Sequence, residues 1–80
     1  MKLILTVLAL AAAPVIAFAQ ATDEQQASID EVLTGMTCEV DPQNVEVEDD
    51  GFDLDDVICA DGQYDIKLDQ GFAVVEQRKE

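Results

Sequence analysis

An apolar run near the amino terminus limits how much of this 80-residue chain can fold as a domain. The run covers residues 3–18, follows a basic second residue, and ends where Ala17 and Ala19 supply the small side chains that signal peptidase accepts. We therefore predict a secretory signal peptide over residues 1–19, cleaved between Ala19 and Gln20. Removal of these 19 residues leaves 61 of the 80, enough for one small domain.

The competing interpretation of this run is a membrane anchor. A spanning helix needs about 20 apolar residues and is usually flanked by basic residues. This run is shorter, and the acidic residues Asp23 and Glu24 follow it. We therefore expect an exported protein with no stable membrane insertion after cleavage.

Two cysteines, Cys38 and Cys59, lie in the mature part of the chain. A domain of this size has a marginal hydrophobic core, and exported proteins reach an oxidising compartment. We therefore predict a disulfide between Cys38 and Cys59. Closing a loop of about 21 residues stabilises the fold by roughly 3 kcal/mol in the chain-entropy model.

The mature chain is strongly acidic. It has three basic residues against 18 acidic ones, a net charge of −15. Repulsion disfavours binding to nucleic acid and to anionic membranes. A solvated acidic surface, a cationic partner and divalent ions are the interpretations that remain.

The first part of the mature chain has the pattern of an amphipathic helix. Thr22 and Gln25 fit a capping box, with acidic residues in the first turn. One helical face is predicted to carry Ile29, Val32, Leu33 and Met36. Ser28 with Glu31 forms a second candidate capping box, so residues 20–27 are either an N-terminal tail or the helix start. Gly35 marks the end of the helix.

The next segments follow a period of two. Residues 41–44 have turn chemistry, and residues 45–48 alternate valine with glutamate, which predicts a half-buried strand. In the following segment Phe52 and Leu54 share one parity, whereas Val57 and Cys59 share the other. The doubled acidic residues 55 and 56 therefore predict a bulge or a break.

Two further strands complete the pattern. Tyr64, Ile66 and Leu68 alternate with polar residues, which predicts the central strand of the sheet. A short turn leads to a last strand around residues 72–77, with either Val74 or Val75 facing inward, and residues 78–80 form a polar tail. We predict an α+β fold: one N-terminal helix packed on a small, mainly antiparallel sheet of three or four strands.

The stretches V-E-V-E-D-D-G and C-A-D-G-Q-Y-D-I-K-L-D-Q-G-F-A-V-V resemble the PepSY domain, named for peptidase propeptides and the YpeB protein. The likeness covers residues 28 to about 77, and we assign residues 28–80 to this domain. It implies a non-catalytic module that binds and modulates a protease or another envelope protein. The similarity to short, stand-alone, exported PepSY proteins favours the periplasm over full secretion.

Catalytic chemistry has little support in the residues themselves. The chain contains no histidine, which excludes the usual base for a serine or cysteine nucleophile, and its one serine, Ser28, lies in the predicted helix. The cysteines lack C-x-x-C spacing, and 61 residues do not easily enclose a cleft between paired carboxylates. We expect no enzyme, no catalytic residue and no cofactor.

The acidic run at residues 46–56 invites a calcium site, since calcium takes oxygen ligands. Aligning Glu46, Glu48, Asp50 and Gly51 with an EF-hand loop places Val57 where a bidentate glutamate is required. No specific metal ligand is therefore predicted. Weak divalent cation binding stays as the alternative function of this acidic protein.

Overall fold

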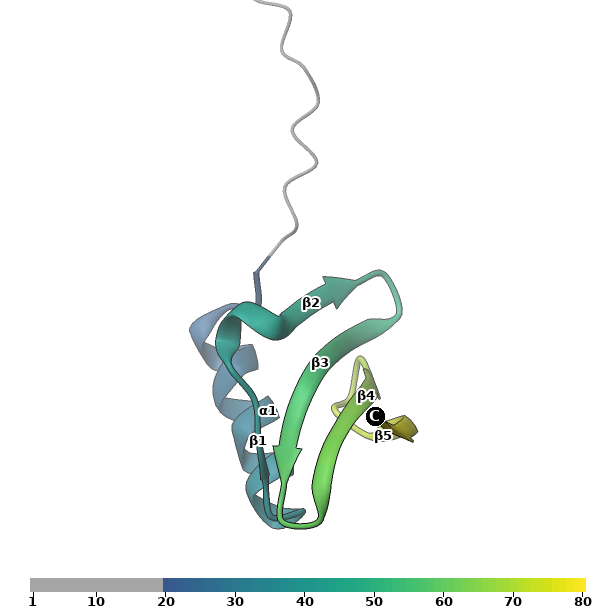
Figure 1. The fold of residues 1–80 in the computed structure, drawn as a ribbon. Helices are drawn as coiled ribbons and strands as arrows, with labels where there is room; N and C mark the ends of the chain where they lie inside the picture. The colour runs from purple at the N-terminus through teal and green to yellow at the C-terminus, as the bar shows by residue number, and fades with distance from the viewer. Residues whose placement is uncertain (1–19) are drawn as a thin grey trace, which may run out of the picture.

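The computed structural model describes residues 20–80. The expected signal peptide, which ends at Ala19, therefore lies outside the described part of the chain. One helix precedes five strands, and every strand pair is antiparallel (Figure 1). In chain order the elements are helix α1 (Asp23–Gly35), β1 (Cys38–Glu39), the 3₁₀ helix η1 (Pro42–Asn44), β2 (Val45–Glu48), β3 (Gly51–Cys59), β4 (Gly62–Asp69) and β5 (Val74–Lys79). The predicted α+β class is confirmed, with five strands in the sheet.

The helix begins at the first of the two candidate caps. The Thr22 hydroxyl accepts from the backbone N–H of Gln25 at 3.1 Å, and the Gln25 side chain accepts from the backbone N–H of Thr22 at 2.9 Å. This reciprocal capping box satisfies two backbone donors that the first turn leaves without helical partners. Ser28 consequently lies inside the helix, and the helix ends at Gly35 as predicted.

The longest strand, β3, organises the sheet. The strand order is β1-β3-β4-β5, and β2 also pairs with β3, beyond β1 along its length. The strand β4 lies inside the sheet, as predicted, between β3 and β5. The strand with the most partners is nevertheless β3, because its nine residues accommodate two short strands along one side.

A bulge in β3 keeps Phe52, Leu54 and Val57 on the same face. Leu54 lies opposite Ile66 and Val57 lies opposite Tyr64, so β3 has one more residue than β4 between these pairs. Leu54 and Val57 are both fully buried. The sequence-based prediction of an irregularity at residues 55 and 56 is confirmed.

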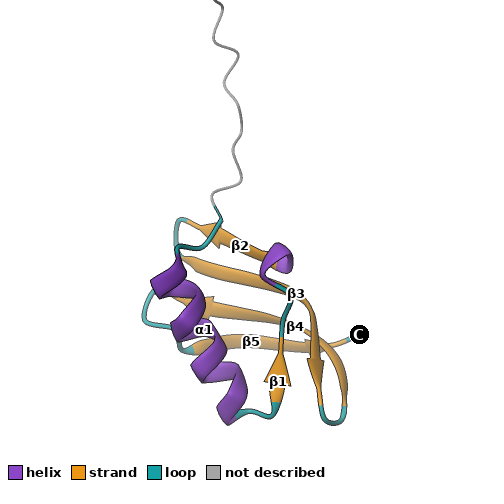
Figure 2. Ribbon diagram, turned by 90° about the vertical axis from the view of Figure 1, so that its left-hand side faces the viewer, coloured by secondary structure: helices purple, strands orange, loops and turns teal. Residues whose placement is uncertain are grey.

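The core lies between the helix and the near face of the sheet (Figure 2). Ile29 and Leu33 contribute from the helix, and both are fully buried. The strands contribute Val45, Phe52, Leu54, Val57, Ile66 and Leu68, with Cys38 beside them. Apart from Cys38, for which the sequence predicted no face, each of these side chains has the periodicity that the sequence pattern assigns to an apolar face.

The last strand differs from its prediction. It covers Val74–Lys79, and all six residues are exposed, with Val74 at 39% and Val75 at 62% of full exposure. Val74 pairs with the buried Leu68 and so lies on the helix side of the sheet, but neither valine is buried in the core. Arg78 and Lys79 lie in the strand and do not form a tail. Backbone pairing with β4 defines this strand, since it lies beyond the core that the helix covers.

Within residues 20–80, no helix is long and apolar enough to cross a membrane.

Candidate functional site

The sheet face opposite α1, which we call the outer face, carries most of the carboxylates of the strands. Strand alternation sends the apolar residues toward the helix and their neighbours toward solvent. The bulge adds a second consecutive acidic residue to this face. Acidic residues of the outer face include Glu46, Glu48, Asp53, Asp55, Asp56, Asp65, Glu76 and Glu80.

The first carboxylate cluster spans β2 and β3. Glu46, Glu48 and Asp53 each offer an oxygen atom within 4.8 Å of the others. Glu46 and Asp53 are direct cross-strand partners, which places two like charges opposite each other. The Lys67 Nζ atom lies 4.0 Å from the nearest Glu48 oxygen and offsets part of this charge.

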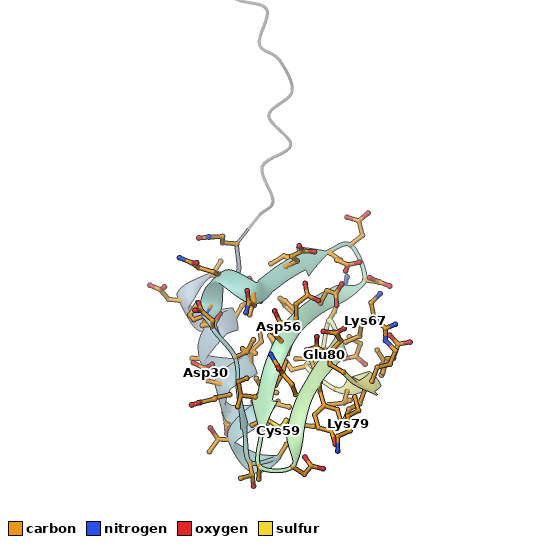
Figure 3. All side chains as sticks on the ribbon, viewed as in Figure 1. Asp30, Asp56, Cys59, Lys67, Lys79 and Glu80 are labelled. Carbon is orange, nitrogen blue, oxygen red and sulfur yellow. A yellow bond between two sulfur atoms is a disulfide. The ribbon has the colours of Figure 1, made fainter. Side chains whose placement is uncertain are left out.

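The second carboxylate cluster brings together residues that are distant in sequence. Asp56 from the bulge, Asp65 from β4 and Glu80 after β5 also offer oxygens within 4.8 Å of one another. Figure 3 shows Asp56 and Glu80 close together on the same side of the sheet as Lys67. Asp65 accepts from the backbone N–H of Asp56 at 3.4 Å and lies 3.7 Å from Arg78.

Crowding of carboxylates changes their acidity. Lys67 lowers the pKa of Glu48, but partial loss of hydration and the nearby Asp53 raise it more, so its net direction is upward. Partial burial and repulsion from Asp53 raise the pKa of Asp55. Partial loss of hydration and a hydrogen bond with Asp56 raise the pKa of Glu80. In each case the environment disfavours the charged form.

These clusters offer cation ligands without the arrangement of an EF-hand. Residues 46–56 form most of the β2–β3 hairpin, and Val57 lies in the core where the EF-hand register would need a ligand. The oxygens are largely exposed, and Lys67 and Arg78 already lie beside them. Such a surface can contact a basic partner directly, and it can also bind divalent cations loosely.

The predicted disulfide between Cys38 and Cys59 is present. The two residues are direct partners in the pairing of β1 with β3. A surface depression of about 470 Å³ lies beside them, lined also by Thr34, Thr37 and Ile58. A disulfide in a small domain is consistent with an extracytoplasmic protein.

A second depression lies at the other end of the domain. It measures about 400 Å³, and Gln25 and Val47 line it together with the stacked rings of Phe52 and Phe72, whose centroids are 5.0 Å apart. Phe72 has a φ of +66° in the turn after β4, and this conformation directs the chain back toward β5. The stacked rings close the core at this end.

The sequence pattern did not predict the positions of three residues at the end of the chain. Arg78, Lys79 and Glu80 were expected in a tail, but β5 aligns the first two with Asp65 and Tyr64. The Lys79 Nζ atom lies 5.8 Å from the centre of the Tyr64 ring. Residues 76–80 are all polar, so they carry no apolar period that could have indicated a strand.

Comparisons of the chain with protein-family models, with curated proteins and with solved structures found no match.

Proposed function

We propose that this chain is an exported, non-catalytic, PepSY-type module of the periplasm that binds a protease or another envelope protein and modulates its activity. The outer face is the contact surface in this proposal, and the partner presents a basic patch to it. Supporting observations are the disulfide between Cys38 and Cys59, the small α+β fold and the sequence resemblance described above.

The observation that carries the proposal is the direct pairing of Glu46 with Asp53. Like charges opposite each other destabilise an antiparallel pair, and packing does not require acidic residues at these exposed positions. Places where a sequence departs from local stability rules are commonly functional. The pair therefore favours a surface whose charge serves binding.

The chemistry of the chain supports a binding role over catalysis. The chain has no histidine, and Ser28 lies within α1, three residues after Gln25 of the capping box. The paired cysteines are joined to each other and do not titrate. Modulation in this proposal consequently depends on occupying a surface of the partner, with no covalent step.

A binding experiment with matched variants tests the proposal. The exported protein is immobilised and exposed to envelope extract, and retained proteins are identified and then titrated individually. Glu46→Gln with Asp53→Asn should weaken binding while raising the melting temperature, because it removes the like-charge pair. The control, Asp30→Asn with Glu31→Gln, removes the same charge from the helix (Figure 3) and should leave binding unchanged.

Equal retention by the two double variants would contradict the assigned surface. Absence of any saturable partner in extract, at concentrations up to about 100 µM, would contradict the proposed function. A rise in stability without a loss of binding would mean that the Glu46–Asp53 pair has no part in recognition.

The alternative function is cation binding, which the two three-carboxylate clusters favour. Calcium titration by calorimetry at constant ionic strength separates it from general screening of charge. A ligand that binds the native state stabilises it by mass action, at concentrations too low to change ionic strength. Saturable binding that a chelator reverses, together with loss of protein partners in chelator, would favour this alternative over the protein-binding module.

A further inference from the structure

The strand β5 forms one edge of the sheet, and its outward backbone groups can be assigned from the ladder. Among residues 20–80, β5 pairs with β4 alone. The backbone N–H of Glu80 donates to the carbonyl of Gln63 at 2.8 Å, so this pair is hydrogen-bonded. Hydrogen-bonded pairs alternate along an antiparallel ladder. Arg78 and Glu76 therefore bond to β4, whereas the backbone groups of Gln77 and Lys79 point away from it, toward the open edge.

The charge of this edge differs from that of the rest of the domain. Apart from Lys2, all basic residues of the chain lie in β4 and β5: Lys67, Arg78 and Lys79. The opposite edge, formed by β1 and β2, carries only acidic charges, at Glu39, Glu46 and Glu48. Self-pairing of that edge would place glutamates against one another, so β5 is the edge whose charge permits contact with a second copy.

We propose that β5 pairs antiparallel with β5 of a second copy of this chain, across a two-fold axis at Gln77. The outward N–H and carbonyl of Gln77 then bond to those of the partner's Gln77. Directly opposed residues in this register point to the same sheet face. Glu76 consequently lies opposite the partner's Arg78 on the outer face, and the symmetry repeats this pair on the other side of the axis.

Other two-fold registers fit the strand less well. An axis at Glu76 or at Arg78 would make that residue a non-hydrogen-bonded pair with its own copy, so two glutamates or two arginines would face each other. Centring on Lys79 would oppose two lysines at the end of the strand. Centring on Val75 would use the residue that the β4–β5 register shift displaces, and it would leave Arg78 beyond the pairing. Centring on Lys79 also pairs opposite charges, Arg78 with the partner's Glu80, but only the Gln77 register does so without opposing two like charges.

The surroundings of the proposed pair support it. Arg78 lies 3.7 Å from Asp65 and remains 69% exposed, so it can contact a carboxylate from each copy. The aliphatic part of the partner's Lys79 would cover Val75, which is 62% exposed. The outer faces of the two copies would then join into one larger acidic surface. Pairing through β5 does not depend on the proposed function, because it uses the edge of the sheet and not the outer face.

Charge-swap variants test the register directly. The exported protein is examined by sedimentation equilibrium at about 150 mM salt, which screens the long-range repulsion between two acidic copies. A six-residue strand contact is small, so concentrations should extend to about 1 mM. We expect dimers for the unaltered protein and monomers for Glu76→Lys and for Arg78→Glu separately. An equimolar mixture of these two variants should form heterodimers, because each lysine or arginine then faces a glutamate.

Two further variants separate the register from general effects of charge and folding. Glu31→Lys makes the same charge change as Glu76→Lys on the helix and should leave the dimer intact. Gln77→Pro removes an outward N–H from an edge strand, where proline is tolerated, and should give a folded monomer by circular dichroism. A monomeric unaltered protein at every concentration would overturn the proposal. Dimers that persist in both single charge variants, or no dimer in their mixture, would overturn it equally.

Discussion

Cys38 and Cys59 are direct partners in the antiparallel pairing of β1 with β3, with their Cα atoms 4.0 Å apart and their sulfur atoms bonded. The pairing fastens the segment that leaves α1 to the end of the longest strand. Only two residues form β1, so backbone hydrogen bonds hold this segment weakly without the disulfide. The covalent bond therefore links the helix layer to the sheet.

Replacing both cysteines by serine should lower the free energy of unfolding by roughly 3 kcal/mol, because the 21-residue separation no longer constrains the unfolded chain. Urea denaturation of the protein with and without the substitutions measures this difference. Thiol titration of the unaltered protein should find no reactive cysteine. Two titratable thiols in the native protein would contradict the bond.

Replacing Ile66 by alanine should cost about 2–5 kcal/mol, since this fully buried side chain leaves a cavity at the centre of the core. The matched control is Val75→Ala, which shortens a β-branched residue that is 62% exposed in the adjacent strand. Thermal unfolding should show a large fall in the melting temperature for the first variant and little change for the second. Similar effects at both positions would mean that the core is misplaced.

Substitution by alanine should have opposite effects on stability at two glycines, Gly51 and Gly35. Gly51 has a φ of +153°, and a Cβ atom there would collide with the carbonyl oxygen of Leu68, so Gly51→Ala should destabilise by on the order of 1–3 kcal/mol. Gly35 lies at the end of α1 with open space around it, so Gly35→Ala should be neutral or slightly stabilising. Denaturant midpoints compare the two variants. A tolerated Gly51→Ala would contradict the close approach of β3 and β4 at this point.

The stability of the domain should increase when the pH falls from 7 to about 5. The pKa values of Glu48, Asp55 and Glu80 are raised in the folded chain, and Asp55 owes this mainly to partial burial and then to Asp53. A carboxyl group with a raised folded pKa binds its proton more tightly in the native state. Its stabilising contribution is therefore present at low pH and is lost as the pH rises through the folded pKa.

Asp55→Asn should raise the melting temperature at pH 7 and reduce its dependence on pH. Asp49→Asn removes the same charge from the exposed β2–β3 turn and serves as the control. Calorimetric melting temperatures across the acidic range check both variants. A melting temperature that falls steadily from pH 7 to about 5 would contradict the cited shifts.

Periodicity predicted the parts of the fold in which apolar burial decides the structure. Ile29 and Leu33 follow the helical period, and Phe52, Leu54 and Val57 revealed the bulge through their mismatch of parity. The spacing of these residues was informative because each of them must face the core. The disulfide was predictable for a different reason, since the small domain contains only two cysteines.

The remaining elements depend on contacts that a local pattern does not contain. Two residues are too few for periodicity to identify β1, which is defined by its pairing with Ile58 and Cys59. In β5 the register shift at Val75 interrupts the alternation, and the residues after it are all polar, so no apolar period marks this strand. The second carboxylate cluster forms because the β4–β5 hairpin brings Glu80 close to Asp65. This proximity depends on the strand pairing, which a local sequence pattern does not contain.

The bulge in β3 makes one residue of the strand removable. Leu54 and Val57 are three positions apart, and a chain shortened by deletion of Asp56 would place them two apart, in regular alternation and in register with Ile66 and Tyr64. Every core side chain would keep its direction, and the outer face would lose one carboxylate. Deletion of Asp53 would instead turn Phe52 toward solvent. Chain length at this position can thus vary by one residue without a change in what the helix contacts, whereas elsewhere in the strand it can change only in steps of two.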